Sequence, residues 1–226
     1  MFYCRTNMGT LALEQEEVSS DTYHVLELKQ LENGSKGIPR VISLLALLLE
    51  RLVQENEKFL ENSQIKDVIT VFHGLRPPSL SIQQYIERIF KYSYCSPSCF
   101  VVSLIYLDRF MQRGNVHLTS LNVHRLLITS VMTAAKFVDD AFFNNAYYAK
   151  VGGISTKEMN RLELKLLFGI DFHLNVSLTT FGEYCSRLEM ETTGAIQIER
   201  LVLACGINDS WSSKEESAKC TSTVAR

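Results

Sequence analysis

One lysine interrupts a stretch of the sequence that otherwise has the composition of a protein interior. Lys136 lies in VMTAAKFVDD, residues 131–140, directly after five apolar or small residues. Because burying an unpaired ammonium is costly, such a lysine is exposed, paired with an acid, or reserved for a binding partner. The stretch by itself leaves these three alternatives open.

Acidic residues offer a second kind of chemistry, magnesium binding against a diphosphate. Asp139-Asp140 resembles the first metal motif of class I terpene synthases, and the spacing of their second motif recurs at Asn208, Asp209, Ser212 and Glu216. The first cluster reads DDAFF and lacks its third acid, while the second lies in a polar segment without apolar lining. Asp139-Asp140 is therefore expected at a solvated helix end or against backbone amides. A terpene-synthase-like, Mg-dependent enzyme remains an alternative.

The cysteines and histidines form no recognisable metal-binding pattern. Of six cysteines only Cys95 and Cys99 are close, and CSPSC lacks a second ligand pair at the spacing of a zinc site. The five histidines show no HxxxH or HExxH spacing, and no GxGxxG, Walker or GxSxG motif occurs. We expect reduced thiols that partly serve as small core residues, no metal or other cofactor, and no enzymatic activity.

Composition and charge narrow the class of protein and the partners. The chain has 226 residues, of which 46% are hydrophobic and 21% charged, as in globular proteins. A net charge of −2 without a dense Lys/Arg cluster argues against a nucleic-acid partner. No apolar run approaches the roughly 20 residues that span a bilayer, and the first twenty residues lack the pattern of a signal peptide. We expect an intracellular protein, in the nucleus and/or cytoplasm, without a membrane partner.

Helical periodicity organises the sequence between residues 39 and 190, and no segment alternates as a strand does. The predicted helices cover residues 39–59, 82–94, 98–113, 121–140, 144–153, 156–168 and 178–191. Ser81 directly precedes the second of these helices. The predicted capping residues are Ser96 before Pro97, Thr119 or Ser120, Ser155 in a capping box with Glu158, and Ser177. These patterns predict an all-α fold.

The predicted helix 98–113 is apolar on every side between Phe100 and Leu107, which places it in the centre of a bundle. The sequence outside the patterned region is mixed and polar. We therefore predict a leader over residues 1–38, one domain over 39–190, and a variable tail over 191–226.

Three motifs in a fixed order carry a family resemblance. CSPSCFVVSLIYLDRF is followed by LNVHRLLITSVMTAAKFVDD and then by FFNNAYYAKVGGISTKEMNRLELKLLFGIDFHLNV. This order resembles the cyclin box of plant U-type (also called P-type) cyclins, which are related to fungal cyclins of phosphate signalling. The resemblance covers about residues 39–190. It implies a single five-helix cyclin box with an extra N-terminal helix and polar tails.

The resemblance also implies a function and a site. A cyclin binds and activates a cyclin-dependent protein kinase, here of the PSTAIRE type, in cell division or in nutrient (phosphate) signalling. By motif, the two polar anchors of that contact fall on Lys136 and Glu163, each a charge inside an apolar run. The small Ala134 and Ala135 are expected to let the partner's backbone approach, with Lys136 reaching toward carbonyl oxygens.

Two departures from the pattern bear on function. The first helix of the box reads SIQQYIERIFKYSY and lacks the MRAIL-type motif that docks substrates in many cyclins. The same fold occurs in TFIIB-like transcription factors, which contact DNA but need paired repeats and basic surfaces. A TFIIB-like factor is therefore the other alternative.

Overall fold

Helices dominate the part of the chain that the computed structural model describes, residues 25–28, 37–63 and 67–190. They are α2 (Arg40–Ser63), α3 (Ile82–Ser93), α4 (Pro97–Gly114), α5 (Val123–Val138), α6 (Asn145–Gly152) and α7 (Thr156–Gly169), and residues 178–190 form a further helix. The described residues contain no strand, which confirms the all-α class, and the predicted tail lies outside them. None of these helices combines the length and apolar content needed to cross a membrane.

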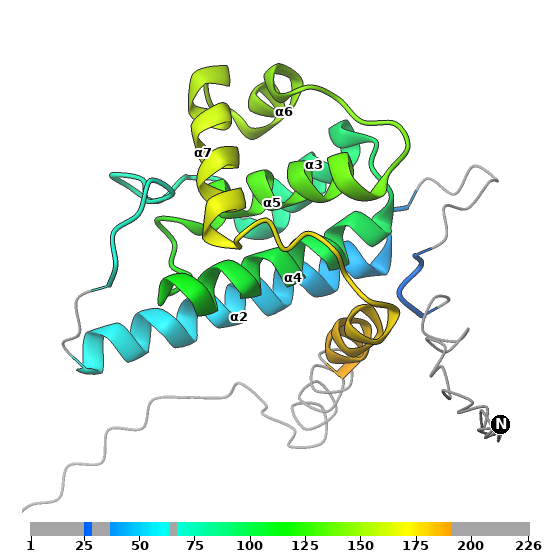
Figure 1. Cartoon of the computed structure of the whole chain (residues 1–226). Helices are drawn as coiled ribbons and strands as arrows, with labels where there is room; N and C mark the ends of the chain where they lie inside the picture. Colours follow the sequence, from blue (N-terminus) through cyan, green and yellow to red (C-terminus); the bar gives the residue numbers. More distant parts are fainter. Residues whose placement is uncertain (1–24, 29–36, 64–66, 191–226) are drawn as a thin grey trace, which may run out of the picture. The chain divides into compact units, whose positions relative to one another are not determined.

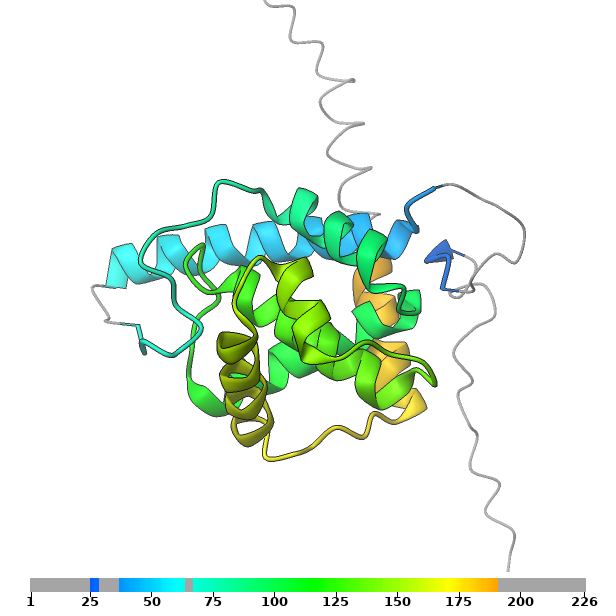
Figure 2. The same cartoon turned by 90° about the horizontal axis from the view of Figure 1, so that it is seen from above.

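α5 is the helix around which the others are arranged. It contacts α3, α4, α6 and α7, whereas α2 packs against α3 and α4. Figure 1 shows α2 and α4 side by side, with α6 and α7 toward the other side of α5. The view from above in Figure 2 shows α2 running along one side of the other helices. α5 therefore links the side of the fold that holds α2 and α4 to α6 and α7.

Two helices, not one, form the centre of the fold. Every residue of α4 from Cys99 to Leu107 is buried, as predicted, but so is every residue of α5 from Leu126 to Ala135. The polar residues of α5 obscured this in the sequence. Thr129 and Thr133 donate their hydroxyls to carbonyls one turn earlier, at 2.7 and 2.8 Å, so they are buried without an unsatisfied donor.

The start of α7 uses half of the predicted capping box. The Ser155 hydroxyl accepts a hydrogen bond from the Glu158 amide at 3.1 Å, as predicted. The Glu158 carboxylate instead pairs with Arg125 of α5 at 2.7 Å, and so joins the two helices. The cap at Ser177 is confirmed, since its hydroxyl accepts from the Thr180 amide at 3.1 Å.

The predicted cap of α5 at Thr119 or Ser120 is wrong. Asn122 is the N-cap, and α5 begins at Val123. The Asn122 side chain accepts from the Thr119 amide at 2.9 Å and donates to the His117 carbonyl at 2.8 Å. These bonds hold the preceding residues in a loop, so helical backbone starts later than the hydroxyl residues suggest.

Part of the predicted leader packs on the core. Leu26 and Leu28 are buried. Glu27 lies between them and accepts a hydrogen bond from the Arg40 amide at 3.0 Å, which satisfies a free amide at the start of α2. The limits of the domain at residues 39 and 190 stay a prediction.

Asp67 anchors the loop between α2 and α3 to the loop between α4 and α5. Its carboxylate accepts from the amides of Val68 and His117 at 2.9 and 3.2 Å, and contacts the rings of His117 and His73 at 3.1 and 3.4 Å. Burial raises the pKa of Asp67, but these hydrogen bonds, led by those of His117, outweigh it and hold the pKa below its ordinary value.

Asp67→Asn is expected to lower the free energy of unfolding at neutral pH by about 1–3 kcal/mol, because donors aimed at a carboxylate lose their charged acceptor. Because the pKa of Asp67 is lower in the folded than in the unfolded protein, its ionised carboxylate stabilises the fold at every pH above the unfolded-state pKa of 3.8. This stabilisation is lost as the pH falls through the folded-state pKa. Denaturant unfolding of the unaltered protein and of Asp67→Asn should be compared from pH 7 downward. The difference between their free energies of unfolding should shrink only below about pH 4. A difference that is unchanged in acid would contradict this role.

Candidate functional site

Lys136 lies in the last turn of α5, where the helix passes from the interior to the surface. The residues before it are buried, whereas Phe137 and Val138 after it are exposed. Its ammonium forms an ion pair with Glu163 of α7, with 2.6 Å between Nζ and Oε1, and also donates to Asn145. The lysine is thus paired with an acid, which rules out that it is simply exposed to solvent.

Glu163 is held from a third helix as well. Asn145, the first residue of α6, donates its Nδ2 to Glu163 Oε2 at 2.6 Å and to Asn160 Oδ1 at 2.8 Å. Lys136, Asn145 and Glu163 therefore join α5, α6 and α7 in one polar network. The side chains of Lys136 and Glu163 are 26% and 18% exposed, so solvent reaches both.

Asn145 and Asn160 were not predicted from the sequence. A neutral amide in a polar segment gives no contrast with its surroundings, unlike a charge in an apolar run. One signal was present: Asn144 suffices to cap α6, since it accepts from the Tyr147 amide, so the adjacent Asn145 is not needed as a cap. Asn160 lies one turn before Glu163 on the same side of α7.

Exposed apolar side chains border this network. Phe137 and Val138 follow Lys136 on α5, and Leu164 and Phe168 lie on one side of α7 next to Glu163. All four are exposed, although the protein has a well-filled core. Clusters of exposed apolar side chains on soluble proteins mark interaction sites.

The expectation that Ala134 and Ala135 face a partner is wrong. Both are completely buried, because this part of α5 lies within the fold. Their small side chains serve internal packing. The surface near Lys136 is instead formed by the residues that follow it in the sequence.

Asp139 ends α5 by bonding to the start of α4. Its carboxylate accepts from the Ser96 amide at 2.9 Å and from the Ser96 hydroxyl at 2.7 Å. The predicted contact of Asp139 with a backbone amide is confirmed, and the helix ends at Val138 rather than at residue 140. Ser96 is the N-cap residue of α4, as predicted, but its hydroxyl makes no capping bond and donates to Asp139 instead. The second acidic cluster, at residues 208–216, lies outside the described residues.

The profile of the Cyclin family matches residues 39–174. This chain belongs to the cyclin family. It is 58% identical to Cyclin-P3-1 of Oryza sativa subsp. japonica over 82% of this chain and 79% of that protein. It is 46% identical to Cyclin-U3-1 of Arabidopsis thaliana over 97% of this chain and 100% of that protein. Cyclin-U4-1 of Arabidopsis thaliana is 55% identical over 74% of this chain and 82% of that protein.

These relatives confirm the resemblance to plant U- and P-type cyclins. In this cyclin, α3 to α7 are the five helices of the box, and α2 is the extra N-terminal helix. Cyclins are regulatory proteins and not enzymes.

Proposed function

We propose that this cyclin binds and activates a cyclin-dependent protein kinase of the PSTAIRE type, and that Lys136 and Glu163 are the polar anchors of the contact. The observation that carries the proposal is the ion pair between them, oriented by Asn145 and bordered by the exposed Phe137 and Leu164. Specific protein interfaces combine apolar contact area with a few well-placed polar groups. This region of α5 and α7 offers both.

The bonds within the network leave capacity for a partner. An ammonium has three donors, and among the described residues Lys136 uses one on Glu163 and one on Asn145. The third is available for a carbonyl oxygen of the kinase. Carbonyls at the C-terminal end of a helix suit it best, because they carry the negative end of the helix dipole. Each oxygen of Glu163 can accept a further bond from a partner amide.

The contact would act on the kinase through its αC helix. Pressure on that helix places its glutamate against the ATP-binding lysine and orders the activation segment, so that the kinase supplies all of the catalytic groups. We place the complex in cell division or nutrient (phosphate) signalling, in the nucleus and/or cytoplasm. Neither nucleic acid nor a membrane is part of the proposal.

The experiment is reconstitution from purified proteins. The full chain is mixed with each PSTAIRE-type kinase of the source organism, and complex formation and peptide phosphorylation are measured. We expect a stable complex whose phosphorylation exceeds that of the kinase alone. Lys58→Ala and Glu61→Ala, at exposed positions of α2, are matched controls that should bind normally.

Absence of a complex with every such kinase would contradict the proposal. Salt-dependent DNA binding by a chain that binds no kinase would favour the TFIIB-like alternative. Magnesium-dependent turnover of a prenyl diphosphate would favour the alternative of a terpene-synthase-like enzyme.

A further inference from the structure

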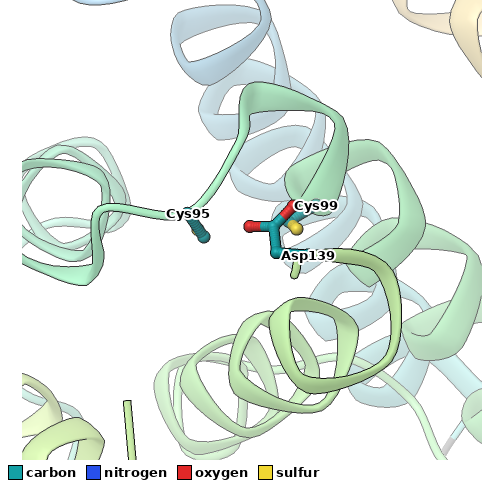
Figure 3. A group of neighbouring side chains, drawn as sticks. All are labelled: Cys95, Cys99 and Asp139. Carbon is teal, nitrogen blue, oxygen red and sulfur yellow. The ribbon is translucent and has the colours of Figure 1, made fainter. Parts of the chain in front are cut away.

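Cys95, Cys99 and Asp139 meet where the start of α4 faces the end of α5 (Figure 3). Their two sulfurs and a carboxylate oxygen all lie within 4.8 Å of one another. Tetrahedral zinc, with ligands at about 2.0–2.3 Å, separates its ligand atoms by about 3.3–3.8 Å. Small side-chain movements would therefore bring all three onto one ion. The CSPSC segment thus gains a third ligand from a residue that is distant in the sequence.

Hydroxyl groups and the start of a helix surround the two sulfurs. Cys99 lies in the first turn of α4, at the positive end of the helix dipole. Ser93 Oγ lies 3.0 Å from Cys95 Sγ, and Ser96 Oγ lies 3.4 Å from Cys99 Sγ. The hydrogen bond from the Cys99 thiol lowers the pKa of Cys95, whereas the same hydrogen bond and burial raise the pKa of Cys99, so a metal ion has to displace the Cys99 proton. Nearby hydroxyls and amides are the groups that orient metal ligands, as Ser96 already does for Asp139.

A separate observation points to a ligand at this place. Tyr148 is 0% exposed, and its hydroxyl has no hydrogen-bond partner among the described residues. Burial raises the pKa of Tyr148, and the neighbouring Cys95, Cys99 and Asp139 raise it further, so the phenol stays protonated and keeps a hydrogen to donate. Buried hydroxyls in native proteins are almost always hydrogen-bonded. A metal-bound water would supply the partner that this phenol lacks.

We propose that Cys95, Cys99 and Asp139 bind one Zn²⁺ ion, with a water or hydroxide in the fourth position facing Tyr148. Two sulfurs and one carboxylate suit zinc, whereas magnesium and calcium take oxygen ligands. The cysteines are buried and Asp139 is partly exposed, so the ion would enter past Asp139. The ion ties the start of α4 to the end of α5, three residues after Lys136. This proposal does not depend on the proposed kinase.

The test uses the full chain, kept reduced and stripped of metal with a chelator. Zn²⁺ is titrated in competition with a chromophoric chelator, and Co²⁺ is titrated as a probe whose near-ultraviolet charge-transfer band requires thiolate ligands. We expect one ion per chain. Cys95→Ser or Cys99→Ser should diminish the cobalt band, and Asp139→Asn or Tyr148→Phe should raise the zinc dissociation constant about tenfold or more.

Two controls separate this cluster from the rest of the chain. Replacing the other four cysteines with alanine should leave binding intact; these are Cys4, Cys185, Cys205 and Cys220. Asp140→Asn is matched to Asp139→Asn and should change nothing. Circular dichroism establishes that each variant is folded. If a serine variant unfolds, the loss of zinc affinity in Asp139→Asn tests the site instead. Absence of stoichiometric binding, or binding that survives both serine variants and Asp139→Asn, would overturn the proposal.

Discussion

Alanine at Lys136 or at Glu163 is expected to weaken kinase binding about thirtyfold or more. In the proposed complex both groups are desolvated, and truncating one member of such a contact costs roughly 2–5 kcal/mol. Each 1.4 kcal/mol of binding free energy changes the affinity about tenfold, so a cost of about 2 kcal/mol already lowers the affinity about thirtyfold. Equilibrium binding to the purified kinase measures it, with Lys58→Ala and Glu61→Ala as controls. Normal affinity in both test variants would refute the assignment of these residues.

The same variants also change the protein itself, because the two residues bind each other across α5 and α7. Removing one partner leaves the other charge partly buried. The side chains of Lys136 and Glu163 are 26% and 18% exposed, so the pair is intermediate between a surface pair and a buried one. A surface pair contributes about 0–1 kcal/mol to stability, whereas breaking a buried pair costs about 3–5 kcal/mol. We expect stability to fall by about 1–3 kcal/mol without unfolding at room temperature. Binding must therefore be measured well below the melting temperature.

A charge swap separates the internal role from the role in binding. Lys136→Glu and Glu163→Lys should each destabilise the protein by placing like charges together. The double variant restores an ion pair and should recover much of the lost stability, since neighbouring substitutions of this kind are not additive. It presents the opposite charges to the kinase, so binding should stay weak. Recovery of kinase binding in the double variant would show that the pair only holds the fold together.

The sequence was informative wherever a local pattern decided the structure. The apolar stripe of α3 and the Ser155 cap of α7 are each visible in about a dozen residues. Lys136 and Glu163 could be singled out because a charge contrasts with an apolar run. Their mutual contact could not be established, since it depends on how α5 and α7 cross, and no local pattern encodes that.

What the sequence did not predict rests on long-range contacts of residues that are locally unremarkable. Asn145 is one amide in a polar segment, yet it bonds Lys136 and Glu163 on two other helices. Asp139 lies 43 positions from Ser96, and only the packing of α5 against α4 brings them together. The early end of α5 and the cluster with Cys95 both follow from that contact. Tertiary structure, and not helix propensity, therefore decides these features.

Leu104→Ala and Leu107→Ala are expected to lower the free energy of unfolding by about 2–5 kcal/mol each. Both side chains lie in the fully buried part of α4 and belong to the main hydrophobic core. Truncation removes buried methyl groups and leaves a cavity that rigid neighbouring helices fill only in part. Domains of this size melt about 2–4 °C lower for each kcal/mol, which gives a fall of about 4–20 °C.

Leu164→Ala is the matched control, because Leu164 is 55% exposed on α7. The same chemical change at an exposed site should alter stability by no more than about 0.5 kcal/mol. Leu164 directly follows Glu163 on α7, so its truncation should weaken kinase binding while leaving the melting temperature almost unchanged. Leu104→Ala should do the reverse, lowering the melting temperature while the folded fraction binds normally. If Leu104→Ala melted like the unaltered protein, α4 would not be at the centre of the fold, and the placement of the kinase-binding surface on its neighbours α5 and α7 would lose its basis.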